Sequence, residues 1–242
     1  MPEHAPVRAG IPIGDLGGGI FGAMGVLAAL QARERSGRGQ HVDVSMLDVQ
    51  ISLLTYMATM HLMSGHVPER IGNSHFVHVP YNTYQTKDGH IIIACIGDAF
   101  FERFLAVVER PELRKPEYLA QPARYADKSL IEQVINEELI QQTSAYWLAR
   151  LQAARVPCGP VNDFESALTD TQVLARDMVV EVPLSGGGSV RMPGMPMKFS
   201  ESNQTSFDPP PTLGRDTESV LAGLLDYDAA HIDALRRDRV IQ

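Results

Sequence analysis

Residues 12–22 read PIGDLGGGIFG, a carboxylate followed by three consecutive glycines and an apolar run. Two hypotheses fit this stretch. In the first, it is a phosphate-binding loop for a dinucleotide, because it matches G-x-G-x-x-G and Asp43 lies about 20 residues further on. The glycines of that match are Gly17, Gly19 and Gly22. In the second, the carboxylate of Asp15 is the working group, and the glycines leave space around it.

The residues before the glycines disfavour the dinucleotide hypothesis. A Rossmann phosphate loop follows a buried strand, whereas the preceding segment, VRAGIPIGD (7–15), contains Pro12 and two glycines besides its terminal aspartate and makes a poor central strand. Asp15 would also place a negative charge beside the pyrophosphate. The match to the glycine pattern is therefore a weak signal.

A long helix is predicted from Leu16 to Arg35. No proline interrupts it, Asp15 is a good N-cap residue, and Arg33 lies where a cation favours a helix C-terminus. One smooth stripe, on which another backbone can approach closely, is formed by Gly18, Gly22, Gly25 and Ala29. Two interpretations of Asp15 stay open: an N-cap, or an ionised nucleophile stabilised by the helix N-terminus.

The rest of the chain alternates helical and strand-like segments. Its first part predicts a strand at 42–44, a helix at 47–63, a connector at 65–72, a hairpin at 81–95 turning at Asp88-Gly89, and a helix at 99–110. Its second part predicts two helices within 126–154, the later one starting near Thr143 or Ser144, a hairpin at 178–199 turning at Gly186–Gly188, an extended loop at 207–214, and two short helices within 217–241. This order predicts α/β layers at both ends around an α+β insertion near residues 70–156.

The composition is that of an ordinary soluble globular protein. With 44% apolar and 21% charged residues, the 242-residue chain can bury a core. Its net charge of −8 argues against nucleic acid or an anionic membrane as the main partner. Two unrelated cysteines, Cys95 and Cys158, and an N-terminus unlike a signal peptide predict a reducing, cytoplasmic location. The apolar stretch 46–63 carries Asp48 and His61, so we expect a core helix there.

The connector holds a second candidate site, Gly72-Asn73-Ser74-His75. A glycine, two small polar residues and an imidazole on a surface loop can close over a ligand. His75 and His78 form H-x-x-H, but no acidic or cysteine third ligand lies at metal spacing, so no metal site is expected. Tyr81 and Tyr84 alternate in the next strand and either line the ligand pocket with His75 or pack within the hairpin.

Four blocks of sequence resemble the class III CoA-transferases, the CaiB/BaiF family. Residues 14–48, GDLGGGIFGAMGVLAALQARERSGRGQHVDVSMLD, closely resemble the central block of that family. Three later blocks follow in the family's order: RIGNSHFVHVPYNTYQTKDGHIIIAC (70–95), ARVPCGPVND (154–163) and PPPTLGRDTESVL (209–221). The resemblance covers essentially the whole chain.

The resemblance implies a fold and an assembly. The fold is α/β, part of a Rossmann-like large domain plus a small α+β domain, in a dimer of interlocked subunits. Residues 1–69 would be a large-domain segment, 70–156 the small domain, and 157–242 a segment that returns to the large domain. The implied protein is a cytoplasmic homodimer without nucleic-acid or membrane partners. Acyl-CoA and a carboxylic acid, in particular a dicarboxylate, are its substrates; coenzyme A is part of the substrate, and no tightly bound cofactor is expected.

The resemblance also implies site residues. The aspartate matching Asp15 is the family's nucleophile, which attacks an acyl-CoA thioester and forms first a mixed anhydride and then an aspartyl-CoA thioester. The loop matching Gly72, Asn73, Ser74 and His75 covers the active site. By position, the backbone N–H groups of Gly17, Gly18 and Gly19 would bind substrate by stabilising the developing oxyanion.

Two alternatives stay open. The family includes α-methylacyl-CoA racemases, which use the equivalent aspartate with a histidine from an upstream region. GDLGGG alone suits them, whereas the GNSH loop followed by VPYNTYQTKDG is more similar to transferases. Family members are also longer ahead of the position of Met1, so this chain is expected to be the C-terminal part of such an enzyme and to be inactive or dependent on a partner when alone.

Overall fold

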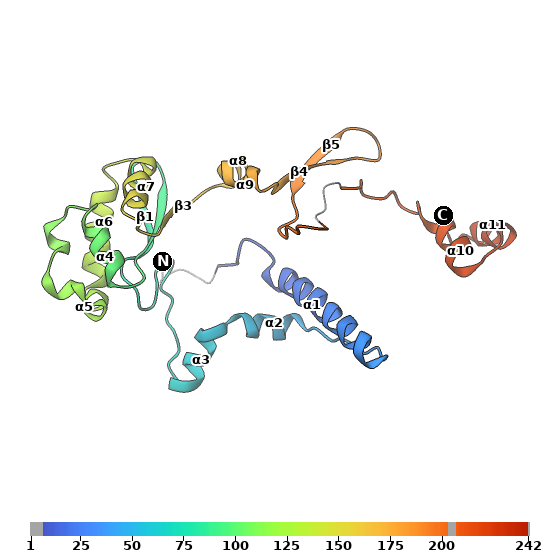
Figure 1. The fold of residues 1–242 in the computed structure, drawn as a ribbon, viewed down its shortest axis with the longest axis horizontal. Coiled ribbons are helices and arrows are strands. Elements are labelled where there is room, and N and C mark those ends of the chain that lie inside the picture. Colours follow the sequence, from blue (N-terminus) through green and yellow to red (C-terminus); the bar gives the residue numbers. More distant parts are fainter. Residues whose placement is uncertain (1–6, 203–206, 242) are drawn as a thin grey trace. The chain divides into compact units, whose positions relative to one another are not determined.

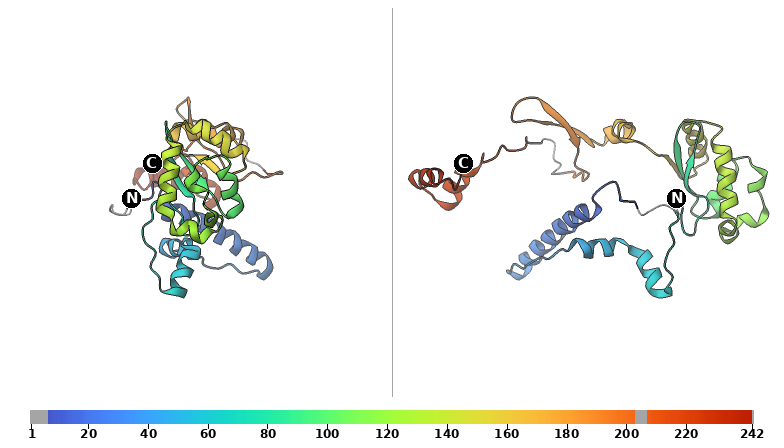
Figure 2. Two further views of the ribbon diagram at one scale, coloured as in Figure 1. Left: turned by 90° about the vertical axis from the view of Figure 1, so that its left-hand side faces the viewer. Right: turned by 180° about the vertical axis from the view of Figure 1, so that it is seen from behind.

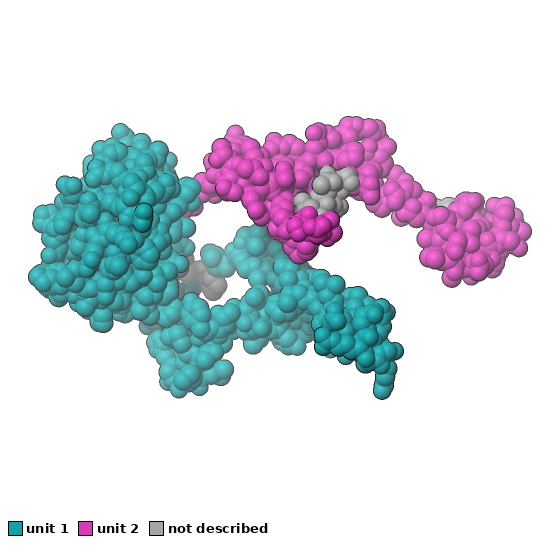
Figure 3. All heavy atoms as spheres, in the orientation of Figure 1, with its two compact units in different colours: residues 1–160 teal, residues 161–242 magenta. Residues whose placement is uncertain are grey.

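The computed structural model describes residues 7–202 and 207–241. The chain forms two compact units, Met1–Pro160 and Val161–Gln242 (Figure 3). The first contains a three-stranded sheet and the second a two-stranded hairpin, each accompanied by helices (Figure 1). This mixed α/β content agrees with the predicted fold class. The finer division into segments 1–69, 70–156 and 157–242 stays a prediction.

Helix α1 spans Ile13–Ser36 and begins earlier than predicted. Its N-cap is Pro12, and no side chain caps it, so the prediction of Asp15 as the N-cap was wrong. Proline suits a helix start because its φ is already helical and it lacks an N–H group. Asp15 lies instead in the first turn, where the helix dipole still favours a negative charge. At the other end Gly37, with φ of 70°, accepts the left-handed C-cap conformation.

Glycines let α1 approach helix α2, which spans Met46–Leu53. A Cβ atom on Gly17 would lie 2.8 Å from Cγ1 of Val49, and one on Gly25 would lie 2.8 Å from Cγ1 of Val42. A methyl group does not fit at such distances, so the glycines set how closely the two segments pack.

The predicted smooth stripe coincides with this contact only in part. Gly18 takes part, since its Cβ would lie 3.3 Å from Cγ of Met46, and so does Gly25. Gly22 does not, because nothing lies within 4 Å of a Cβ placed there. The stripe receives valine and methionine side chains rather than another backbone.

The segment after α1 differs from the prediction in two ways. Residues 42–44 have no regular secondary structure and pair with no strand in the described part of the chain, so the predicted strand was wrong. The single helix predicted at 47–63 is two helices, α2 and α3 (Thr55–Ser64). Thr55 has φ of 50°, a conformation that a β-branched residue rarely adopts, and the helix axis is broken there.

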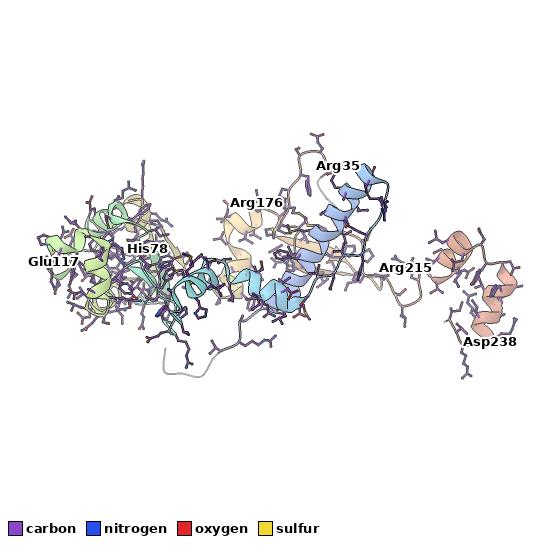
Figure 4. All side chains as sticks on the ribbon, turned by 90° about the horizontal axis from the view of Figure 1, so that it is seen from below. Arg35, His78, Glu117, Arg176, Arg215 and Asp238 are labelled. Atoms are coloured by element: carbon purple, nitrogen blue, oxygen red, sulfur yellow. The ribbon has the colours of Figure 1, made fainter. Side chains whose placement is uncertain are left out.

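Helix α1 leaves much of its apolar surface exposed. None of its residues is buried, and the side chains of Ile20 and Leu27 are 61% and 66% exposed. Its length and the apolar character of its first five turns would allow it to cross a membrane, a test that core helices of soluble proteins also pass. Arg35, labelled in Figure 4, lies in its last turn, as predicted. The exposed apolar face of α1 that contains Ile20 and Leu27 marks a contact surface.

The three-stranded sheet contains β1 (Tyr81–Gln85), β2 (His90–Ala94) and β3 (Cys158–Pro160), all antiparallel in the order β1-β2-β3. The predicted hairpin is confirmed: Gln85 pairs with His90, and the turn carries Asp88-Gly89. The carboxylate of Asp88 accepts hydrogen bonds from the N–H of Ser144 (2.7 Å) and the hydroxyl of Thr86 (3.2 Å). This turn is therefore tied to the helix that begins at Ser144.

Helices pack on one face of this sheet and close the core of the first unit, so that Ile91 and Ile93 of β2 are buried while Ile92 between them is exposed (Figures 1 and 2). They are α4 (Asp98–Leu105), α5 (Gln121–Ala126), α6 (Lys128–Leu139) and α7 (Ser144–Ala153), with the 3₁₀ turns η1 (Pro111–Leu113) and η2 (Pro116–Leu119). Thr143 caps α7, as predicted. The guanidinium of Arg124 is wholly buried and each of its nitrogens is hydrogen-bonded, donating among others to the carbonyls of Val79 and Tyr118 and to the carboxylate of Asp98.

The second unit contains short elements. Helices α8 (Phe164–Thr169) and α9 (Thr171–Ala175) precede the hairpin of β4 (Val179–Pro183) and β5 (Ser189–Pro193), and α10 (Thr217–Leu225) and α11 (Ala229–Arg237) follow it. The hairpin, its turn at Gly186–Gly188 and the two tail helices are confirmed; α8 and α9 were not predicted. Residues 207–212 form no helix or strand, as expected of a proline-fixed loop.

Candidate active site

The carboxylate of Asp15 is exposed and unpaired. It forms no hydrogen bond or ion pair with any residue in 7–202 or 207–241. The backbone N–H groups of Gly14 and Asp15 also bond to no other described backbone group, as expected in the first turn of a helix. A free carboxylate beside unpaired N–H groups combines a nucleophile with donors for a developing negative charge.

A hollow of about 620 Å³ lies next to Asp15. Its lining comes from the segment before α1, from the first turn of α1 and from α2: Arg8, Ala9, Ile11, Pro12, Ile13, Gly14, Asp15, Met46, Gln50, Leu53 and Leu54. Most of these side chains are apolar, while Arg8 adds a cation and Gln50 an amide. The hollow therefore offers an acyl group an apolar wall within reach of a carboxylate.

The three glycines after Asp15 lie on the side of α1 that packs against α2 or on its exposed surface. Gly17 and Gly18 face α2, and none of Gly17, Gly18 and Gly19 is among the described residues that line the hollow. Because α1 begins at Ile13, their N–H groups fall inside the hydrogen-bond ladder of the helix. Their role in substrate binding stays a prediction, and the unpaired N–H groups lie earlier, at Gly14 and Asp15.

The loop Gly72–His75 is anchored by side chains at its base and exposed at its tip. Gly72, with φ of +65°, and Asn73 are exposed, whereas Ser74 and His75 are half-buried. The hydroxyl of Ser74 donates to the carboxylate of Glu132 (3.0 Å), and the N–H of His75 donates to the carbonyl of Tyr81 (3.0 Å). The ammonium of Lys128 donates to the carbonyl of His75 (3.3 Å).

The imidazole of His75 holds the following turn. Its Nδ1 accepts hydrogen bonds from the N–H groups of Val77 (3.0 Å) and His78 (3.1 Å), which places the proton of the neutral ring on Nε2. The ring stacks on Phe76 (4.4 Å between centroids) and Tyr81 (4.9 Å). Burial, with His78 and Lys128 adding repulsion, lowers the pKa of His75, so the ring is neutral at pH 7.

The described residues contain no cluster of metal ligands, and Cys95 is a buried thiol. No three His, Cys, Asp or Glu side chains gather as a metal site between residues 7 and 202 or 207 and 241. Nδ1 of His78 (labelled in Figure 4) is buried without a hydrogen-bond partner in that part of the chain. Burial raises the pKa of Cys95 to about 12, so its thiol is protonated and not a nucleophile.

The structure brings together some predicted residues but not all. His75 and Tyr81 meet, while Tyr84 is wholly buried in the core of the sheet, which favours hairpin packing for that side chain. The hollow at Asp15 contains none of Gly72–His75 among its described lining residues. The sequence interpretation missed Lys128 and Glu132, although their spacing of four on a predicted helix places them on one face.

Comparisons with known proteins agree with the resemblance. The family model described as CoA-transferase family III matches residues 1–217. The chain is 35% identical over 244 residues to a succinyl-CoA–L-malate CoA-transferase alpha subunit of Chloroflexus aurantiacus, covering 100% of this chain and 57% of the relative. It is 29% identical over 243 residues to a succinyl-CoA:glutarate CoA-transferase of Mus musculus, covering 100% of this chain and 56% of that relative.

A solved structure from the same family also matches the chain. The crystal structure of a CaiB/BaiF family protein from Brucella suis matches with a TM-score of 0.78 and 29% identity, covering 92% of this chain and 58% of that one. The chain thus spans little more than half the length of these relatives. With sequence, fold and family model in agreement, the chain belongs to CoA-transferase family III.

Proposed function

We propose that this chain takes part in moving CoA from an acyl-CoA thioester to a carboxylic acid, with Asp15 as the nucleophile. The observation that carries the proposal is the unpaired Asp15 carboxylate in the first turn of α1, beside a hollow of about 620 Å³ with a mainly apolar lining. A carboxylate attacks only when ionised, and the helix N-terminus favours that form.

The chemistry proceeds by exchange of anhydrides and thioesters. Asp15 attacks the thioester carbonyl, the C–S bond breaks, and CoA leaves as a thiolate. The thiolate then attacks the aspartyl carbonyl of the anhydride, releases the donor carboxylate and leaves an aspartyl-CoA thioester. The acceptor carboxylate attacks this thioester and expels the thiolate again. Attack of the thiolate on the acceptor's acyl carbon gives the new acyl-CoA and restores Asp15.

Dicarboxylates are the proposed acceptors and donors. Both curated relatives described above are named for succinyl-CoA together with a second dicarboxylic acid, malate or glutarate. In this chain Arg8 is one of the residues that line the hollow next to Asp15. A guanidinium at that place would hold the distant carboxylate of a short dicarboxylic acid while the near one reacts.

The active assembly is proposed to contain more polypeptide than one copy of this chain. Support comes from the exposed apolar side chains of α1, such as Ile20 and Leu27, and from the share of the relatives that the chain spans. A second copy, as in a cytoplasmic homodimer, or a further large-domain polypeptide would cover that face. Light scattering on the purified chain tests this, since a stable monomer with full activity would contradict it.

The covalent step is tested by trapping. Protein incubated with succinyl-CoA is treated with hydroxylamine or borohydride, and the peptide containing Asp15 is examined by mass spectrometry. A mass change on Asp15 is expected, and an active preparation with unmodified Asp15 would overturn the mechanism. Exchange of the substrate α-proton with deuterated water would instead indicate the racemase alternative.

A further inference from the structure

One face of α6 carries three polar residues spaced by four: Lys128, Glu132 and Asn136. Each bonds outside the helix. Lys128 donates to the carbonyl of His75, Glu132 accepts from the hydroxyl of Ser74, and Asn136 accepts from the N–H of Gln85 at 3.2 Å. Other positions on α6 are buried apolar residues of the core: Ile131, Val134, Ile135 and Leu139. The polar stripe is thus mounted on a helix that the core holds in place.

Lys128 and Glu132 hydrogen-bond to the loop directly after its tip, at His75 and Ser74. From His75 onward the chain is fixed, because its N–H bonds to Tyr81 and its ring holds the next turn. Ahead of His75, the N–H of Ser74 donates to the carbonyl of Ile71 (3.3 Å) and closes the turn that carries Gly72 and Asn73. Within this turn the side chain of Asn73 bonds to no described residue, and a Cβ placed on Gly72 would meet nothing within 4 Å. The Ser74–Glu132 hydrogen bond is therefore the side-chain attachment next to this exposed tip.

The charge of Glu132 makes this attachment stronger than a bond between neutral groups, because an ionised acceptor about doubles the strength of a hydrogen bond. The carboxylate is half-buried, so water competes with Ser74 less than it would at an exposed site. Lys128 lies one turn earlier and fixes the next residue of the loop through its carbonyl. Together the two side chains restrain the orientation of Ser74 and His75.

We infer that Glu132 is a positioning residue that acts through Ser74, with Lys128 as its second support, and orients the Gly72–Asn73 tip over the bound acyl group. The inference rests on the proposed function and on the covering role that the family resemblance implies for this loop, since the orientation of the tip matters to the reaction only if the loop covers an acyl-enzyme. A well-placed cover excludes water from a reactive anhydride or thioester. Loss of the anchor should therefore let water compete with the acceptor for the intermediate.

The test uses the full chain in its active assembly, with succinyl-CoA as donor and malate as acceptor. Glu132→Ala and Ser74→Ala are each expected to lower kcat by about tenfold, the loss typical of one charged hydrogen bond, and to raise the ratio of hydrolysis to transfer. The double variant should be no worse than either single one. Glu132→Gln retains an acceptor oxygen and should recover most of the transfer activity.

The matched control is Gln133→Ala, on the exposed side of the same helix, where the side chain bonds only to Glu137 among the described residues. It should change neither kcat nor the hydrolysis ratio, and thermal melts should show every variant folded. Wild-type protein that traps no acyl group on Asp15 would overturn the proposed function, and this inference with it. Normal trapping in the wild type, together with an unchanged hydrolysis ratio in Glu132→Ala and Ser74→Ala, would overturn this inference alone.

Discussion

The backbone N–H of Ser144 donates a 2.7 Å hydrogen bond to the carboxylate of Asp88, and so joins the turn of the β1–β2 hairpin to the start of α7. The residues are 56 positions apart in the chain. A charge in a hairpin turn thereby serves as a support for the N-terminus of a helix, where an anion is favourable. The contact lowers the pKa of Asp88, chiefly through the backbone hydrogen bond from Ser144.

A pH dependence follows from this contact. Because the folded pKa of Asp88 lies below its ordinary value of 3.8, its contribution to stability is fully present above pH 3.8. The contribution is lost as the pH falls through the lowered pKa. Asp88→Asn should therefore lower the Tm at pH 6 and leave it nearly equal to that of the wild type at the acid end. Thermal melts of both proteins over this pH range check the prediction, and a Tm difference that does not shrink in acid would contradict it.

The glycines of α1 predict stability changes of opposite sign. A methyl group added by Gly17→Ala would lie 2.8 Å from Cγ1 of Val49, and the stiff valine side chain has little freedom to move away. Overpacking costs about 1–3 kcal/mol, which outweighs the gain of about 1 kcal/mol in helix propensity. Gly19→Ala gains the propensity alone, because nothing lies within 4 Å of its Cβ position.

Urea unfolding of the two variants checks this pair. Gly17→Ala is expected to lower the free energy of unfolding, while Gly19→Ala is expected to raise it by up to about 1 kcal/mol. A shift of the same sign in both variants would show that the α1–α2 contact is not set by the glycine face.

Two buried tyrosines form a second matched pair. The hydroxyl of Tyr84 is buried without a hydrogen-bond partner among the described residues, and burial raises the pKa of Tyr84 well above its ordinary value. The hydroxyl of Tyr118 donates to the carboxylate of Asp127 at 2.5 Å. Tyr84→Phe should leave stability unchanged or raise it by about 1 kcal/mol, whereas Tyr118→Phe should cost about 1–3 kcal/mol. Equal losses of unfolding free energy would reveal a partner for Tyr84.

Replacement of Asp15 tests the centre of the proposed site. Asp15→Asn removes the nucleophile but keeps the size of the side chain, so CoA transfer should fall by at least about 10³-fold, with no trapped acyl group. Asp43→Asn is the control, because Asp43 completes the glycine fingerprint but does not line the hollow. Transfer assays on both variants decide between the two hypotheses for PIGDLGGGIFG. A loss with Asp43→Asn alone would restore the dinucleotide hypothesis.

The sequence predicted the elements whose signals are local. Asp88-Gly89 between alternating strands specified a hairpin, and the residues Thr143 and Ser144 specified the start of α7. It failed where a distant contact decides the conformation. Val42 lies against Gly25 and pairs with no strand among the described residues, and the break at Thr55 carries no proline or glycine to announce it.

The same distinction holds for the site. Asp15 could be singled out because a carboxylate followed by glycines is a local feature. The hydrogen bond that anchors the loop could not be predicted in this way, because Ser74 and Glu132 are 58 residues apart and neither is unusual in its own segment. Only the packing of α6 beside the sheet brings the carboxylate to the hydroxyl.

Arg8 provides a prediction about specificity. Arg8 lines the hollow next to Asp15, so its guanidinium is proposed to bind the distant carboxylate of a dicarboxylic acceptor. Arg8→Ala should raise the KM for malate by about tenfold and leave the KM for a monocarboxylic acceptor such as acetate unchanged, because acetate has no second charge to bind. Arg8→Lys keeps the charge without the bidentate geometry, so its KM for malate should lie between those of the wild type and Arg8→Ala. Steady-state kinetics with both acceptors check this. An equal rise of KM for malate and acetate would mean that Arg8 shapes the hollow without binding the second carboxylate.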